Sequence, residues 1–234
     1  MPGSVRSKAG GLAKSSGNRR SARIETGPAL IDDAMTCGST CVWRNSSIVP
    51  VQPAALEVLA SAAPVLSRWG RWYVFGAQAV SAYGVPRLSA DVDVTLALVP
   101  DVPERFAQDL EAAGFALRVE EPDFVKRTRV MPFVHRATAM PLDVVLAGSG
   151  LEDEFLDRAA IVEIGGTAVP LIDVGDLIIA KVLAGRPKDV EDATALWRLH
   201  HREVDADRIR RTLRLLEEAL GQSDLISGFE AIAR

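Results

Sequence analysis

Two periods of hydrophobic and polar positions run along the chain, and they predict where helices and strands form. Apolar residues at helical spacing predict helices at 53–69, 77–83, 103–113 and 151–159. Short apolar or alternating runs predict strands at 72–76, 89–99, 115–119, 130–135 and 142–146. The run 161–172 predicts a hairpin that turns at Gly165-Gly166.

After Asp173 the pattern is helical throughout, with helices expected at 174–185, 187–201 and 206–221 and a short one at the end. The expected fold is therefore α+β (α/β), a small mixed β-sheet flanked by helices and followed by a helical C-terminal portion. The core is expected at 51–172 and the helical portion at 173–234. Residues 1–50 are rich in Gly, Ser, Arg and Asn and have no sustained apolar period, which predicts a disordered basic tail.

Composition and charge narrow the class of protein. The net charge of −4 combines a basic first fifty residues with an acidic remainder. An acidic body argues against sequence-blind duplex binding, which needs a basic surface, but allows a nucleotide or a nucleic-acid end beside metal ions. No apolar run is long enough for a membrane span, and the start lacks the apolar core of a secretory signal. With only two cysteines, a cytoplasmic location is expected.

Asp91 and Asp93 stand in the alternating run 89–99, which is otherwise rich in Val and Leu. Residues two apart in a strand share a face, so the two carboxylates are expected about 6.5–7 Å apart. Carboxylates that close repel unless a cation lies between them. Hard oxygen ligands suit Mg²⁺ (or Mn²⁺), which binds a few carboxylates together with substrate phosphates. The pair predicts a metal site, although a solvated strand edge explains many such pairs.

Asp143 supplies a third acid, at the start of the later apolar strand 142–146. If that strand lies beside the one that carries Asp91 and Asp93, three carboxylates converge. Two-metal phosphoryl transfer needs such a set, because one ion activates the attacking oxygen and the other neutralises the leaving pyrophosphate. Asp143, reaching only the ion on the acceptor side, is expected to help deprotonate the attacking hydroxyl.

Gly76 stands between a predicted strand and a predicted helix. A glycine there lets a phosphate approach the backbone, where the first amides of the helix face it. A simple tight turn is the alternative.

Two blocks of residues resemble a known family. The first block is Gly76-Ala77-x-Ala79, Gly84 and Arg87-x-Ser89-x-Asp91-x-Asp93, and the second is Leu177-Ile178-x-x-Lys181 and Arg186-Pro187-Lys188-Asp189-x-x-Asp192. With Asp143 between them, they resemble the minimal nucleotidyltransferases of the DNA polymerase beta-like superfamily, and more closely the AbiEii toxin-like nucleotidyltransferases. The resemblance implies transfer of a nucleotidyl group from a nucleoside triphosphate to an acceptor hydroxyl, on an RNA end or a protein, with release of pyrophosphate.

The resemblance also implies roles for individual residues. Asp91 and Asp93 would bind both metal ions and Asp143 one, with Lys181 as a further catalytic residue that reaches the triphosphate. The residues implied at the nucleotide are Gly76, Ala77, Arg87, Ser89, Lys181, Asp189 and Asp192. Without the family context, a surface lysine on an amphipathic helix is the simpler explanation of Lys181.

Three functions therefore stay open. The first is an active nucleotidyltransferase, expected to be the toxin of a toxin–antitoxin pair with an antitoxin protein as its partner. The second is a catalytically silent nucleotide-binding regulatory module. Many superfamily members have Ser or Gly where this chain has Ala77, and that departure motivates the second function. The third is an aminoglycoside-type enzyme that modifies a small molecule by the same chemistry.

Overall fold

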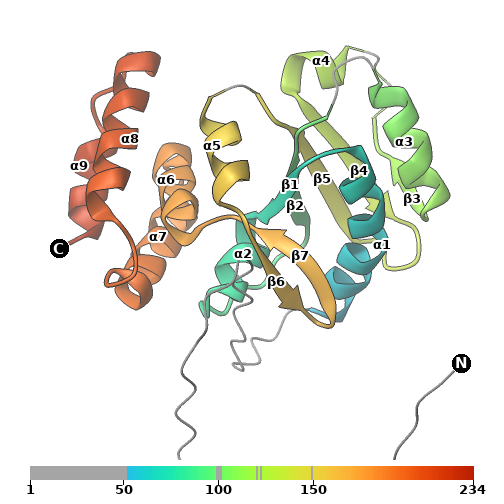
Figure 1. The fold of residues 1–234 in the computed structure, drawn as a ribbon, viewed down its shortest axis with the longest axis horizontal. Coiled ribbons are helices and arrows are strands. Elements are labelled where there is room, and N and C mark those ends of the chain that lie inside the picture. Colours follow the sequence, from blue (N-terminus) through green and yellow to red (C-terminus); the bar gives the residue numbers. More distant parts are fainter. Residues whose placement is uncertain (1–51, 99–101, 120, 122, 149) are drawn as a thin grey trace, which may run out of the picture. The chain divides into compact units, whose positions relative to one another are not determined.

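The computed structural model describes residues 52–98, 102–119, 121, 123–148 and 150–234, and it confirms the expected fold class (Figure 1). The predicted tail, residues 1–50, lies outside the described residues. The strands in these ranges are β1 (Trp72–Phe75), β2 (Val92–Leu96), β3 (Phe115–Leu117), β4 (Val130–His135), β5 (Pro141–Leu146), β6 (Ala160–Ile164) and β7 (Thr167–Leu171). They form one sheet in the order β3-β4-β5-β2-β1-β7-β6.

The strand β2 lies inside this mixed sheet. It pairs antiparallel with β1 and parallel with β5. The predicted hairpin is confirmed as β6 and β7, with Ile164 opposite Thr167 and both turn glycines at positive φ. Since the parallel neighbour β5 is the strand that carries Asp143, the adjacency on which the three-carboxylate hypothesis depends is present.

The helices include every one that the hydrophobic period predicts. Their bounds are α1 (Pro53–Trp69), α2 (Gly76–Ala82), α3 (Pro103–Ala112), α4 (Phe124–Thr128), α5 (Leu151–Arg158), α6 (Val174–Ala184), α7 (Pro187–His200), α8 (Ala206–Leu220) and α9 (Leu225–Ile232). The short α4 was not predicted, and it buries no side chain, so it leaves no apolar period in the sequence. In the described ranges, no helix is both long and apolar enough to cross a membrane.

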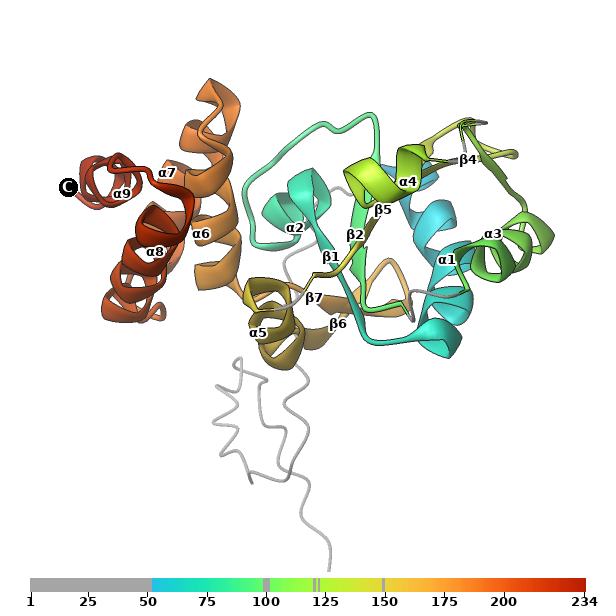
Figure 2. The same ribbon diagram turned by 90° about the horizontal axis from the view of Figure 1, so that it is seen from above.

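The two faces of the sheet have different neighbours. Figure 2 shows α1 and α3 on one side of the sheet and α2 and α5 on the other. Trp72 faces α1, where its Nε1 donates to Ser67 Oγ at 3.0 Å. The next residue, Tyr73, faces the other side and packs against Phe155 of α5, with ring centroids 6.5 Å apart. In register with Tyr73 and Phe75, alternate residues of β2 and β5, including Asp93 and Asp143, lie on this second face.

The helix α6 organises the C-terminal helices. The side chain of Asp173 caps its N-terminus by accepting from the amides of Gly175 and Asp176. The fully buried Asp176 carboxylate accepts from Arg158 of α5, with Nε at 2.7 Å, and from Arg208 of α8. Breaking a buried ion pair leaves an uncompensated charge, so this network fixes α6 against both neighbours. The division of the chain into domains at residue 173 stays a prediction.

Candidate active site

Three carboxylates converge at the carboxyl-terminal end of β1 and the start of β2. Asp93 of β2 lies directly opposite Asp143 of β5 in the parallel register, and Asp91 immediately precedes β2. One carboxylate oxygen from each lies within 4.8 Å of the others, and all three residues are half-buried. The three predicted metal ligands therefore meet at one point. The expectation that Asp91 lies inside the strand is wrong, because its backbone carbonyl accepts from Gln78 Nε2 at 3.2 Å instead of entering a strand ladder.

Gly76 begins α2 and lies against Asp93. Its φ is +66°, a conformation that favours glycine. A Cβ placed on Gly76 would lie 2.0 Å from Asp93 Oδ2, closer than any non-bonded contact allows. Gly76 therefore leaves room for the Asp93 carboxylate, a role that the sequence did not predict. Ala77 follows as the second residue of α2, and the predicted contact of both residues with a phosphate stays a prediction.

Burial and mutual repulsion perturb Asp93. Desolvation, followed by the charges of Asp91 and Asp143, raises the pKa of Asp93 to about 7, and Lys181 and Lys188 offset this only in part. A divalent cation would relieve the repulsion and hold all three groups ionised. Three clustered carboxylate oxygens are the donor set that Mg²⁺ or Mn²⁺ prefers, so the residues fit such an ion.

Ser89 orients Asp91. Its hydroxyl donates to Asp91 Oδ1 at 2.6 Å. The hydroxyl therefore binds a carboxylate of the site, and the expected contact of Ser89 with the nucleotide stays a prediction. The loop between α2 and β2 is also tied down at Arg87, whose carbonyl accepts from Ser81 Oγ at 3.1 Å.

Lys181, Asp189 and Asp192 form a buried ionic cluster beside the carboxylates. Lys181 Nζ donates to Asp189 Oδ1 and to Asp192 Oδ2, each at 2.9 Å. The Lys181 side chain is 10% exposed, so the surface-lysine explanation is wrong. Arg87 Nη1 lies 3.2 Å from Asp192 Oδ1, and Arg186 donates to Asp189. Neither Asp189 nor Asp192 joins the metal-ligand group, so the cluster holds cations and does not extend the metal site.

Two further cations at the site were not assigned roles from the sequence. Lys188, in the first turn of α7, is close enough to lower the pKa of Asp93. Arg118, just after β3, donates through Nη2 to Asp143 Oδ1. Lys188 stands inside the recognised block and its position was a usable signal. Arg118 is 25 residues from its partner, and only the strand pairing brings the two together.

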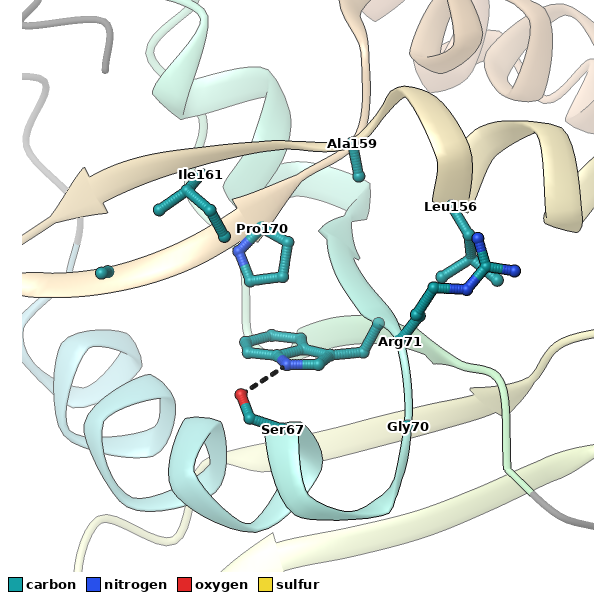
Figure 3. A pocket seen from close by; sticks show the side chains of 9 residues that line it. Ser67, Gly70, Arg71, Leu156, Ala159, Ile161 and Pro170 are labelled. Atoms are coloured by element: carbon teal, nitrogen blue, oxygen red, sulfur yellow. Dashed lines mark hydrogen bonds between the residues drawn. The ribbon is translucent and has the colours of Figure 1, made fainter. Parts of the chain in front are cut away.

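A separate cavity of about 280 Å³ opens elsewhere on the sheet (Figure 3). Its lining residues are Ser67, Gly70, Arg71, Trp72, Leu156, Ala159, Ile161, Ala168 and Pro170. It is located at the opposite end of β1 from Gly76 and contains none of the three carboxylates. The candidate active site is therefore defined by the carboxylate group and not by this cavity.

Comparison with solved structures finds matches at low identity. No protein-family model matches the chain, and no curated protein matches it. The solution structure of the antibiotic-resistance factor ANT(2'')-Ia is 16% identical, with 72% of this chain and 93% of that chain covered and a TM-score of 0.47. A crystal structure of ANT(2'')-Ia in complex with adenylyl-2''-tobramycin is 18% identical, with coverage of 71% and 97% and a TM-score of 0.45. An antigenic nucleotidyltransferase-like protein from Paracoccidioides brasiliensis is 17% identical, with coverage of 78% and 95% and a TM-score of 0.47.

Similarity at this level establishes neither a family nor an activity for the chain. The resemblance to the AbiEii toxin-like family stays a prediction. The case for function rests on the geometry of the site.

Gly76→Ala tests the contact between the glycine and Asp93. We expect Mn²⁺ binding to weaken about 10- to 100-fold, the range typical when the support of a metal ligand is lost. Gly221→Ala is the matched control, because Gly221 has φ +67° and no atom within 4 Å of the added Cβ. Both variants should lose roughly 1 kcal/mol of stability from the backbone conformation, but only the first should lose metal affinity. Equal Mn²⁺ affinity in the two variants would contradict the contact.

Asp93→Asn tests the raised pKa through the stability of the metal-free protein. The folded state holds the Asp93 proton up to about pH 7, whereas the unfolded chain releases it near its ordinary value of 3.8. The folded state therefore binds more protons between these values, and wild-type stability falls as the pH rises through this window. In chelator, Asp93→Asn should exceed the wild type at pH 8 by about 2–4 kcal/mol, with the difference shrinking toward pH 5.

Urea unfolding at several pH values measures this difference. Asp157→Asn, which alters an exposed carboxylate paired with Arg71, is the control and should show no such trend. A gain of Asp93→Asn that stays constant from pH 5 to pH 8 would mean that Asp93 titrates normally.

Proposed function

We propose that the chain is a metal-dependent nucleotidyltransferase, which moves a nucleoside monophosphate from a nucleoside triphosphate to an acceptor hydroxyl. The observation that carries the proposal is the meeting of Asp91, Asp93 and Asp143 within 4.8 Å on one face of the sheet. Two further facts support it. The pKa of Asp93 is raised to about 7, and Gly76 makes room for the Asp93 carboxylate. A fold with no use for the group would lose stability by keeping it.

The carboxylates divide the work of the reaction. Mg²⁺ or Mn²⁺ bound there would activate the acceptor oxygen and stabilise charge on the leaving pyrophosphate. Asp93 lies beside both Asp91 and Asp143 and would share metal ions with each of them. Ser89 keeps Asp91 in its orientation. The acceptor oxygen would attack the α-phosphorus as the bond between the α-phosphorus and the bridging oxygen to the pyrophosphate breaks, and Asp143 would accept the hydroxyl proton.

The ionic cluster provides the counter-charge for the triphosphate. Lys181, Arg87 and Arg186 share two carboxylates, and Lys188 adds another cation near Asp93. The cations outnumber the anions, so the cluster leaves net positive charge beside the carboxylate group. The Nε of Arg87 is buried and has no hydrogen-bond partner among the described residues, so this guanidinium keeps one unused donor beside the carboxylates. Asp189 and Asp192 act here as positioning residues that fix the cations.

The acceptor class is proposed on a different basis. The resemblance of the two sequence blocks to AbiEii toxin-like nucleotidyltransferases favours an RNA end or a protein hydroxyl as acceptor, with the protein acting as the toxin of a toxin–antitoxin pair. A small cationic acceptor of the aminoglycoside type and a silent nucleotide-binding module are the competing outcomes.

Transfer of label from each α-labelled nucleoside triphosphate, with Mg²⁺ or Mn²⁺, tests the proposal. Acceptors are total RNA, total protein, the enzyme itself and an aminoglycoside. We expect label in the RNA or protein fraction and a loss of at least about a hundredfold with Asp93→Asn, because the metal ligand at the centre of the group is removed. Asp157→Asn, which alters an exposed carboxylate paired with Arg71, should retain activity.

Each other outcome has a defined meaning. Label in the aminoglycoside alone would support the small-molecule function. Triphosphate binding without label in any fraction would support the silent module. Equal transfer by the wild type and Asp93→Asn would contradict the assignment of the site.

A further inference from the structure

The guanidinium of Arg118 forms an ion pair with Asp143, one of the three carboxylates that the proposed function assigns to metal. Arg118 Nη2 donates to Asp143 Oδ1, and the two side chains are 40% and 30% exposed. Asp143 thus has a cation from the protein itself, whereas Asp91 accepts from the neutral hydroxyl of Ser89. The carboxylates are therefore not equivalent before a metal ion binds.

The strand register explains why Arg118 reaches this position. The backbone amide of Arg118 donates to the carbonyl of Pro132 at 2.8 Å. Pro132 lies opposite Asp143, and Asp143 lies opposite Asp93. These four residues form one row, which runs from the residue after β3 across β4, β5 and β2. Pro132 has a short ring with no charged or hydrogen-bonding side-chain group, so the long arginine extends past it to Asp143.

The neighbouring basic residues have other partners. Arg127 pairs with Glu121 at 2.8 Å, and Lys126 lies 3.6 Å from Asp123. Each of these pairs joins residues of the same short segment and contacts none of the three carboxylates. In the part of the chain that the structure describes, Arg118 is the cation from this edge of the sheet that pairs with the site.

The two cationic regions flank the carboxylates from opposite directions. Lys181 and its partners come from α6 and α7, while Arg118 comes from the β3 end of the sheet. If the nucleotide uses the first region, as proposed above, the acceptor is left with the second. Arg118 then faces the acceptor, and a guanidinium is well matched to an acceptor phosphate.

We propose that Arg118 is a positioning residue that couples acceptor binding to completion of the metal site. It holds Asp143 until an anionic group of the acceptor draws the guanidinium away, and the carboxylate then becomes free to bind a metal ion fully. The proposal rests on the proposed function and deepens it, because it selects acceptors that carry a phosphate near the reacting hydroxyl. By linkage, metal and acceptor each raise the affinity for the other. The coupling also limits hydrolysis of the triphosphate by water when no acceptor is bound.

Mn²⁺ titration, followed by electron paramagnetic resonance of the free ion, tests the coupling on the whole chain. Arg118→Gln removes the competing charge and should tighten the weaker Mn²⁺ site about fivefold, as expected for a partly exposed ion pair. Arg118→Lys keeps the charge and should resemble the wild type. Arg127→Gln, which breaks an exposed pair with Glu121 on the same segment, is the matched control and should leave Mn²⁺ binding unchanged.

The direction of the change separates this inference from a merely structural role. If Arg118 only supported Asp143, Arg118→Gln would weaken Mn²⁺ binding, and that result would overturn the proposal. Sulfate, used as a probe of the acceptor phosphate, should tighten Mn²⁺ binding to the wild type relative to chloride at equal ionic strength, but not to Arg118→Gln. Equal effects of sulfate on both proteins would also overturn it.

Failure of the inference and failure of the proposed function give different results. Wild-type protein that binds no Mn²⁺ would overturn both. Normal Mn²⁺ binding that is lost in Asp93→Asn but is the same in the wild type and Arg118→Gln would overturn the coupling alone and leave the metal site intact.

Discussion

The repulsion among three carboxylates gathered on one face of the sheet is the constraint on which the rest of the site depends. Asp93 and Asp143 are opposite each other on adjacent strands, and the chain adds Asp91 from the residue before β2. The fold accommodates the Asp93 carboxylate because Gly76 has no side chain. Gly76 also adopts a positive φ, which favours glycine. Burial and repulsion together raise the pKa of Asp93 to about 7. The repulsion among the carboxylates destabilises the folded protein in the absence of metal, and a bound divalent cation would remove this cost. Functional sites commonly lower the stability of a protein in this way.

The surroundings of the carboxylates are asymmetric. On one side, Asp189 and Asp192 hold the buried Lys181, and they also pair with Arg87 and with Arg186, whose side chain is largely exposed. The proposed function assigns this side to the triphosphate, and there the buried Lys181 is fixed before any ligand arrives. On the other side a single arginine holds Asp143 through a partly exposed pair. Such a pair is weak enough to exchange, so the two sides differ in rigidity as well as in position.

Most of the fold could be predicted from the sequence because the hydrophobic period is strong in most elements. The helix that carries Lys181, the β6–β7 hairpin and the strand around Asp143 were all predicted. The short α4 was missed because it buries nothing. The three carboxylates could be selected from their residue types and spacing, but their meeting depended on β5 lying parallel beside β2. Nothing in a single sequence fixes that neighbour.

The contacts of the site residues were less predictable than their identity. Gly76 was expected to receive a phosphate, and its contact with Asp93 follows only from the three-dimensional path of α2 and β2. Ser89 was expected at the nucleotide, and its hydrogen bond to Asp91 was not predicted. The contact of Arg118 with Asp143 could not be predicted, because it depends on two strand pairings, β3 with β4 and β4 with β5. Residue types indicated the chemistry, and long-range pairing decided the contacts.

Anomalous scattering from crystals grown with Mn²⁺ and a non-hydrolysable nucleoside triphosphate is the most direct test of the central claim. We expect manganese peaks with carboxylate oxygens of Asp91 and Asp93 about 2.0–2.4 Å away, the range for small divalent cations with oxygen ligands. The triphosphate should extend from the metal toward Lys181 and Arg87. Nucleotide bound elsewhere, or no manganese peak at these carboxylates, would contradict the account.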